Sequence, residues 1–341
     1  MLTNIKDRPP KIDAKIARAC HADLAQWYAA NHRDLPWRRH PTPYHVTVSE
    51  FMCQQTQIAT VLPYYARWMN SFPDWRALAA ASDATVLKHW EGLGYYNRVR
   101  NLHRLAKLIV SEHSGNLPAD SHALQQLPGI GPYTAAAIAS IASGEQVAVL
   151  DGNVERVLTR LFALPWNVSL PLTKKNLRQL AAELLPKKNC GDHNQAMMEL
   201  GALICSPRHP QCPRCPLTVI CRGKTNPEQF PNKTKTLTVK ERQTVAVITS
   251  DGKIWLLNPA ERGRWHGFPR LPLFDETHMT KGAPLTVIHY SITRYRVTAT
   301  AVSAKFKHHP PANGAWLPLS ALKKIPLPAP HRKILRQAPL P

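Results

Sequence analysis

Apolar residues recur at helical spacing between about Lys15 and Cys205, where each run has one apolar face. Short polar or proline-containing stretches such as "SFPDW" separate the runs, which predicts many helices joined by brief connections. The segment from Arg98 to Val110 shows the pattern most clearly. Its apolar stripe consists of Val99, Leu102, Leu105, Ala106 and Ile109. The basic residues around the stripe, beginning with Arg98, indicate either a solvated face or a set of phosphate contacts.

The pattern changes after Cys221. A polar, basic segment with two prolines follows and is typical of a linker, which we place at 229–240. Beyond it, runs of β-branched and aromatic residues flank Asp251 and Gly252, a signal for a β-hairpin. The 341 residues suffice for two cores, so we predict an all-α domain over 1–228 and a smaller α+β domain over 241–341.

A glycine-rich turn stands within the helical region. Gly129 and Gly131 in "LPGIGPYTAAAIAS" predict a turn that exposes backbone amides, and the helix expected from Pro132 adds the positive end of its dipole. Such a turn can bind a phosphate, although a turn that only joins two packed helices can have the same sequence. Further along, Asp151 precedes Asn153, which we expect to cap the next helix. The Asp151 carboxylate then either favours that helix end or has a chemical role.

The charge of the chain changes this picture from a generic helical protein to a binder of polyanions. Lys and Arg number 44 and Asp and Glu 22, and from Phe230 onward there are 18 basic against 5 acidic residues. Nucleic acid is the commonest partner of so basic a chain. The alternative is that the charge only maintains solubility.

Four of the seven cysteines lie close together in the sequence and predict a metal site. Cys205, Cys212, Cys215 and Cys221 have the spacing C-x6-C-x2-C-x5-C, which can enclose one tetrahedral ion or one cubane cluster. Only the central pair is close, so we favour [4Fe-4S] over zinc. No apolar signal segment opens the chain and no long apolar run occurs. We therefore expect reduced or metal-bound thiols, a cytoplasmic protein and no membrane span.

Together the turn, Asp151 and the cysteine loop resemble the helix-hairpin-helix DNA glycosylases of the endonuclease III superfamily, and within it the MutY-type branch that removes adenine opposite 8-oxoguanine. The resemblance covers residues 30–222. The matching segments are "LPWR" (35–38), "PYHVTVSEFMCQQTQIATV" (43–61), "WEGLGYYNRVRNL" (90–102), "LPGIGPYTAAAI" (127–138), "LDGNVERVL" (150–158) and "NQAMMELGALIC" (194–205).

The resemblance implies the following catalytic roles. Glu50 is the acid that protonates adenine, and its apolar surroundings predict a raised pKa. Asp151 stabilises the sugar cation, Asn153 orients either Asp151 or the reacting sugar, and Arg38 lines the adenine pocket. Tyr133 occupies the position at which strand-cutting relatives carry a Schiff-base lysine, so we expect base removal without strand cleavage and a Tyr133 hydroxyl near Asp151. The alternative for Glu50 is a structural role at a helix N-terminus after Ser49.

The resemblance also implies the partner and the way it is held. The partner is duplex DNA containing 8-oxoguanine:A or G:A mispairs, and the protein is expected to be a monomer. Gly129 and Gly131 grip the backbone, Gln55 fills the helix near the lesion, and Tyr95 wedges beside 8-oxoguanine. Gln55 and Tyr95 are also plausible as packing residues, although the glycines before Tyr95 indicate an exposed loop tip.

The α+β domain resembles the Nudix-like domain with which this family recognises 8-oxoguanine. No "REXXEE"-like carboxylate run is present, so we do not expect nucleotide hydrolysis. The family's Phe-Ser-His loop aligns with Ile292, Thr293 and Arg294, which makes Thr293 and Arg294 the candidate lesion readers. Two alternatives remain for the whole chain: a glycosylase of the same fold for thymine or oxidised pyrimidines, and a non-catalytic DNA-binding protein.

Overall fold

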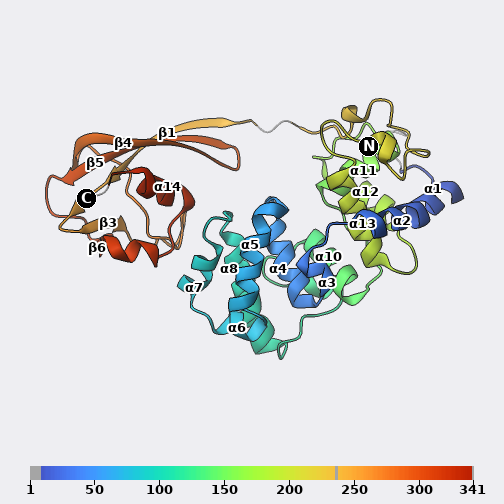
Figure 1. The fold of residues 1–341 in the computed structure, drawn as a ribbon, viewed down its shortest axis with the longest axis horizontal. Helices are drawn as coiled ribbons and strands as arrows, with labels where there is room; N and C mark the ends of the chain where they lie inside the picture. The colour runs from blue at the N-terminus through green and yellow to red at the C-terminus, as the bar shows by residue number, and fades with distance from the viewer. Residues whose placement is uncertain (1–8, 235–236, 340–341) are drawn as a thin grey trace. The chain divides into compact units, whose positions relative to one another are not determined.

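A computed structural model describes residues 9–234 and 237–339 (Figure 1). Backbone contacts divide the chain into two compact units. One comprises Met1–Ile58, Phe72–Ala79 and Arg104–Lys235, and the other comprises Ala59–Ser71, Ala80–His103 and Thr236–Pro341. The domain boundaries inferred from the sequence remain a prediction.

Residues 14–203 are helical, as the apolar pattern predicts. The helices are α1 (Ala14–Arg18), α2 (Leu24–Asn31), α3 (Pro36–Arg39), α4 (Pro43–Cys53), α5 (Ile58–Ser71), α6 (Trp75–Ala80), α7 (Asp83–Trp90), α8 (Asn97–Glu112), α9 (Ser121–Leu124), α10 (Pro132–Ser143), α11 (Gly152–Leu161), α12 (Pro171–Glu183) and α13 (Cys190–Leu203). A π-helical turn at Ala19–Asp23 joins α1 to α2. None of the described helices is long and apolar enough to cross a membrane.

Helix α8 confirms the predicted apolar stripe, because its five members are completely buried. The expectation for Arg98 is wrong, however. Its side chain is buried against Trp90 and Tyr95 and donates to the carbonyls of Leu93 and Gly94. The guanidinium thus supports the loop before α8 and is not part of a solvated face.

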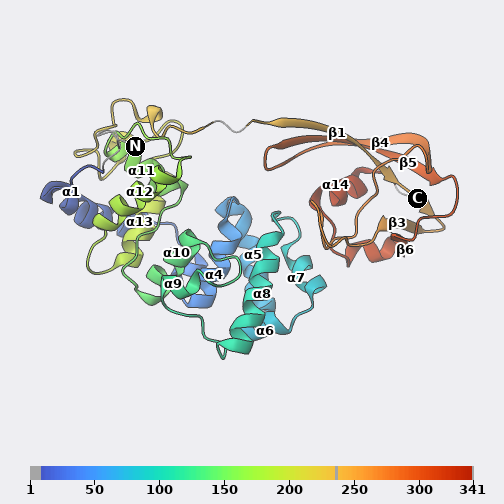
Figure 2. The same cartoon turned by 180° about the vertical axis from the view of Figure 1, so that it is seen from behind.

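Helix α13 packs against both α10 and α11, and α10 also packs against α4 (Figures 1 and 2). Gly201 makes the approach of α13 to α11 possible. A Cβ atom at Gly201 would lie 2.6 Å from the Cβ of Asn153, closer than packed side chains allow. These contacts bring together the ends of α4, α10 and α11 that carry the site.

The C-terminal region has an α+β structure, as predicted. Its strands are β1 (Val239–Val247), β2 (Thr249–Ser250), β3 (Lys253–Leu257), β4 (Met279–Ile292), β5 (Tyr295–Phe306) and β6 (Gly314–Pro318), and it ends in α14 (Ala329–Gln337). One sheet has the order β1-β5-β4, with β1 and β5 parallel, and the other has the order β2-β3-β6. Apolar residues of β1, β3, β4 and β5 form a core with α14.

Two turn predictions in this region have different outcomes. The hairpin at Asp251 and Gly252 is confirmed, because both residues have positive φ and Ser250 pairs with Lys253. The bounds of the predicted linker, 229–240, stay a prediction, and the last two residues of that segment belong to a strand. Strand β1 begins at Val239, since that segment pairs in parallel with β5 from Tyr295 onward.

Candidate active site

Glu50 lies in the last turn of α4, and its Oε2 is buried without a hydrogen-bond partner in the described part of the chain. Burial raises the pKa of Glu50 from 4.5 to about 7. The Asp151 charge adds to that rise, while a hydrogen bond from Tyr133 and the charge of Arg38 oppose it. The raised pKa confirms the expectation from the sequence. The alternative of a helix N-terminal role is wrong, because α4 begins seven residues earlier at Pro43.

Tyr133 stands in the first turn of α10 and points its hydroxyl at Glu50. The hydroxyl donates to Sδ of Met198 at 3.6 Å, and it is also near enough to the Glu50 carboxyl to hydrogen-bond with it. Burial and the neighbouring carboxylates raise the pKa of Tyr133 well above its ordinary value, so the phenol stays protonated. The sequence placed this hydroxyl near Asp151. The charges of both Glu50 and Asp151 act on the hydroxyl, which is consistent with a position near Asp151, and its role stays a prediction.

Asp151, rather than Asn153 as expected, caps the helix that follows. Its Oδ1 accepts from the backbone N–H groups of Asn153 and Val154 at 2.9 and 2.7 Å, and its Oδ2 accepts from Asn153 Nδ2 at 2.8 Å. Asp151 is preferred as the cap because its two oxygens satisfy three donors at once. Burial raises the pKa of Asp151, and these hydrogen bonds counteract the rise. The site therefore holds one carboxyl group that keeps its proton up to about pH 7 and a second whose charged form is supported by three N–H groups.

The glycine turn precedes α10 as predicted, but its two glycines differ. Gly129 has a φ of 78°, a left-handed conformation that favours glycine. Gly131 is the N-cap residue of α10 in an extended conformation, with no side-chain cap and open space where a Cβ would lie. Backbone conformation therefore explains Gly129, whereas neither conformation nor packing explains Gly131.

The ion-pair group around Arg38 has no counterpart among the residues predicted from the sequence. Glu199 of α13, only 1% exposed, accepts from Arg33 and Arg38 at 2.7 and 2.8 Å. Burial alone would raise the pKa of Glu199, but the hydrogen bonds from these two arginines lower it to about 2. One signal in the sequence could have indicated this group. Glu199 is the lone acid of the apolar segment "NQAMMELGALIC", and a buried acid requires cationic partners.

The four predicted cysteine ligands gather around one hollow after α13. Cys205, Cys212, Cys215 and Cys221 all line it, and backbone N–H groups of Leu217 and Gly223 donate to the sulfurs of Cys215 and Cys221. Across residues 9–234 and 237–339, no three His, Cys, Asp or Glu side chains converge as a site for a single metal ion.

Two buried arginines of α11, also missed, contact this cysteine loop. Arg156 donates to Asn153 Oδ1 and to the Cys205 carbonyl at 2.8 and 2.7 Å. Arg160 lies 3.4 Å from Cys205 Sγ and donates to the carbonyls of Ser206 and Pro207. The hollow therefore has a cation beside one sulfur and N–H donors beside two others, a set of groups that fits a cluster of thiolate ligands.

The residues predicted to contact a lesion are exposed and have unusual backbones. Gln55 follows α4 with φ 55°, and Tyr95 has φ 49° and is 45% exposed. Thr293 and Arg294 form the two-residue turn between β4 and β5, where Thr293 has φ 50°. A β-branched residue is strained in that conformation. The exposure expected for Tyr95 is confirmed, whereas the functions of all four residues remain predictions.

Comparison with known proteins agrees with this geometry. Residues 48–187 match the family model of the HhH-GPD superfamily base excision DNA repair proteins. The adenine DNA glycosylase of Homo sapiens is 45% identical over 64% of this chain and 41% of its own length, so the chain spans about two fifths of that relative. The adenine DNA glycosylase of Mycolicibacterium smegmatis is 38% identical over 71% of this chain and 87% of its own length.

Solved structures show the same fold. A thermostable thymine-DNA glycosylase has a TM-score of 0.57 and 27% identity, covering 62% of this chain and 99% of its own. A non-covalent endonuclease III–DNA complex has a TM-score of 0.54 at 24% identity, covering 63% of this chain and 98% of its own. The chain therefore belongs to the adenine DNA glycosylase family within the HhH-GPD superfamily of base excision DNA repair proteins.

Proposed function

We propose that the protein hydrolyses the N-glycosidic bond of adenine mispaired with 8-oxoguanine or guanine in duplex DNA. The observation that carries this proposal is the pairing of Glu50, with a pKa of about 7 and a free carboxyl oxygen, with Asp151. Breaking this bond requires an acid for a poor leaving group and an anion for an oxocarbenium-like sugar. Two carboxyl groups with opposite protonation meet both needs.

In the proposed mechanism, Glu50 protonates a ring nitrogen of the flipped adenine and then accepts a proton from the attacking water. Asp151, held by three N–H groups, stabilises the positive charge that develops on the sugar. Tyr133 donates to Glu50 and has no amine with which to form a Schiff base, so the product is an abasic site in an intact strand. Arg38, fixed by Glu199, borders the base pocket.

The DNA contacts are proposed from the turn and the loops. The amides at Gly131 and the N-terminus of α10 suit a phosphate, and the absence of a side chain at Gly131 lets the backbone approach it. Gln55 and Tyr95 enter the duplex where the base leaves, because both are exposed at strained positions. Thr293 and Arg294, at the tip of the β4–β5 hairpin, read the 8-oxoguanine in a domain of Nudix type.

The cysteine loop is proposed to hold a [4Fe-4S] cluster through Cys205, Cys212, Cys215 and Cys221. The cluster would supply a rigid centre on which the basic loop residues are mounted, and Arg160 would stabilise the charge of the Cys205 thiolate. Zinc is the alternative. Metal analysis separates the two, because a cluster gives a coloured protein that contains iron, whereas zinc gives a colourless protein without iron. A monomeric state and a cytoplasmic location remain predictions.

A single-turnover assay tests the proposed activity. Duplexes containing 8-oxoguanine:A, G:A, G:T or only normal pairs are incubated with the protein, and the strands are analysed with and without alkali. We expect cleavage of the two adenine mispairs only after alkali, and a loss of about 100-fold or more in Glu50→Gln. Strand breaks without alkali, or activity confined to G:T, would contradict the proposal.

A further inference from the structure

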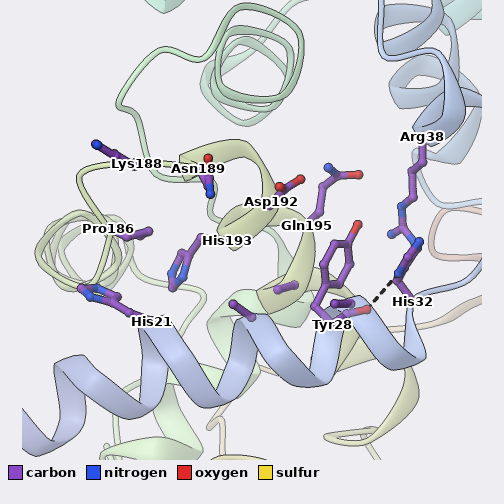
Figure 3. Close-up of a pocket in the computed structure, with 13 residues that line it drawn as sticks. His21, Tyr28, His32, Arg38, Pro186, Lys188, Asn189, Asp192, His193 and Gln195 are labelled. Carbon is purple, nitrogen blue, oxygen red and sulfur yellow. Dashed lines mark hydrogen bonds between the residues drawn. The ribbon is translucent and has the colours of Figure 1, made fainter.

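A hollow of about 410 Å³ lies between α2 and the beginning of α13, apart from Glu50 and Asp151 (Figure 3). Its size is in the range of sites for small organic ligands. Ala25 and Ala29, one turn apart on α2, line it with small side chains, which leaves the space unfilled. Arg38 stands at one end of the hollow.

Four of the side chains that line the hollow are aromatic or imidazole rings, namely His21, Tyr28, His32 and His193. The rings of Tyr28 and His32 stack at a tilt with centroids 4.9 Å apart, and those of His21 and His193 meet edge to face at 6.1 Å. Hydrogen bonds hold two of these rings in place. His32 Nδ1 bonds the Tyr28 carbonyl (Figure 3) and His21 Nε2 bonds the Leu184 carbonyl, each at 2.9 Å. Such surfaces favour a planar aromatic ligand.

The charges of the hollow argue against an inorganic anion. The Arg38 guanidinium is neutralised by Glu199 at 2.8 Å, and the other two lining residues with permanent charge, Lys188 and Asp192, have opposite signs. Burial lowers the pKa of His193 to about 4, so this imidazole is neutral at pH 7. The amides of Asn189 and Gln195 add uncharged donors and acceptors. The pocket therefore suits an uncharged ring with hydrogen-bonding groups along its edge.

We propose that this hollow is a second site for a free purine base, separate from the place where the base is removed from DNA. The identity of the natural ligand as adenine rests on the proposed function. Arg38 links the two places, since it lies over the Tyr28 ring, bonds Glu199 and interacts with Glu50. A base in the hollow therefore contacts the same guanidinium that borders the proposed base pocket.

Calorimetric titration of free adenine into the full chain bound to a duplex with a non-hydrolysable adenine nucleotide opposite 8-oxoguanine tests the proposal, because the adenine of the duplex then fills the catalytic base pocket. Ala29→Leu and Ala25→Leu fill the hollow from an exposed helix face. Ala30→Leu, exposed on the same helix but outside the hollow, is the matched control. We expect one saturable site in the wild type and the control, and at least about 10-fold weaker binding in both filling variants.

Equal adenine binding in all four proteins, or no saturable binding in the wild type, would overturn the proposal. Inorganic phosphate that binds and displaces adenine would also overturn it, because the hollow would then be an anion site. Single-turnover base removal is measured in parallel. Adenine binding without base removal would refute the proposed function alone, whereas base removal without a second adenine site would refute this inference alone.

Discussion

Glu50 and Glu199 are two glutamates of the same compact unit whose ionisation differs because of their partners. Burial favours the neutral form of both. Around Glu50 a single phenol donates and a second carboxylate lies nearby, so its pKa rises to about 7. Around Glu199 two guanidinium groups donate, and its pKa falls to about 2. Burial keeps Glu50 protonated, and the two guanidinium donors that overcome burial make Glu199 a structural anion.

The largest expected effect on the fold comes from removing the anion. Glu199→Ala leaves the partly buried Arg33 and Arg38 without their carboxylate, and we expect a loss of about 3–5 kcal/mol in the free energy of unfolding. Chemical denaturation at pH 7 measures it. Glu183→Ala, an exposed acid on α12, is the control and should change stability by less than about 0.5 kcal/mol. Similar losses in the two variants would remove the distinction drawn for Glu199.

The second effect is a difference in pH dependence. The folded pKa of Glu50 is raised, so the folded state binds more protons than the unfolded state between pH 4.5 and about 7, and the Glu50 contribution to stability falls as the pH rises through that window. Glu50→Gln removes this dependence. Relative to wild type, the variant should gain about 3 kcal/mol between pH 4.5 and pH 8. No relative gain would mean that Glu50 titrates normally.

The smallest expected effect comes from changing Arg38, which bonds Glu199 and whose charge also acts on Glu50. Arg38→Gln removes one donor to Glu199 and one positive charge near Glu50, so the pKa of each should rise. Glu199 should nevertheless stay ionised at pH 7, because Arg33 still donates to both of its oxygens. Carboxyl carbon NMR of selectively labelled glutamate follows both groups, with Arg39→Gln, an exposed neighbour, as the control. A neutral Glu199 in Arg38→Gln would show that Arg33 alone is insufficient.

The sequence predicted much of the fold because its signals were local. Helix and strand periodicity, the Asp251–Gly252 turn and the α8 stripe depend on residues close in the chain, and the structure confirms them. The differences concern competition between neighbours. Asp151 displaced Asn153 as a cap because its carboxylate accepts from more donors, and β1 extended into the expected linker because β5 was available as a partner.

The site was predicted only in part, since its remaining contacts join distant segments. Glu50, Tyr133 and Asp151 were identified through motif resemblance, and their interaction is visible in the structure. Glu199, Arg33 and the arginines of α11 carry no motif. Their roles depend on pairings across up to 166 residues of sequence, which periodicity and spacing do not specify.

The central claim is that Glu50 in the DNA-free protein keeps its proton up to about pH 7. Carboxyl carbon NMR of the wild type, with the Glu50 signal assigned by its absence in Glu50→Gln, measures this directly. The account predicts a midpoint near pH 7 for that signal. A midpoint near the ordinary value of 4.5 would contradict it, because Glu50 would then be ionised and unable to protonate a base.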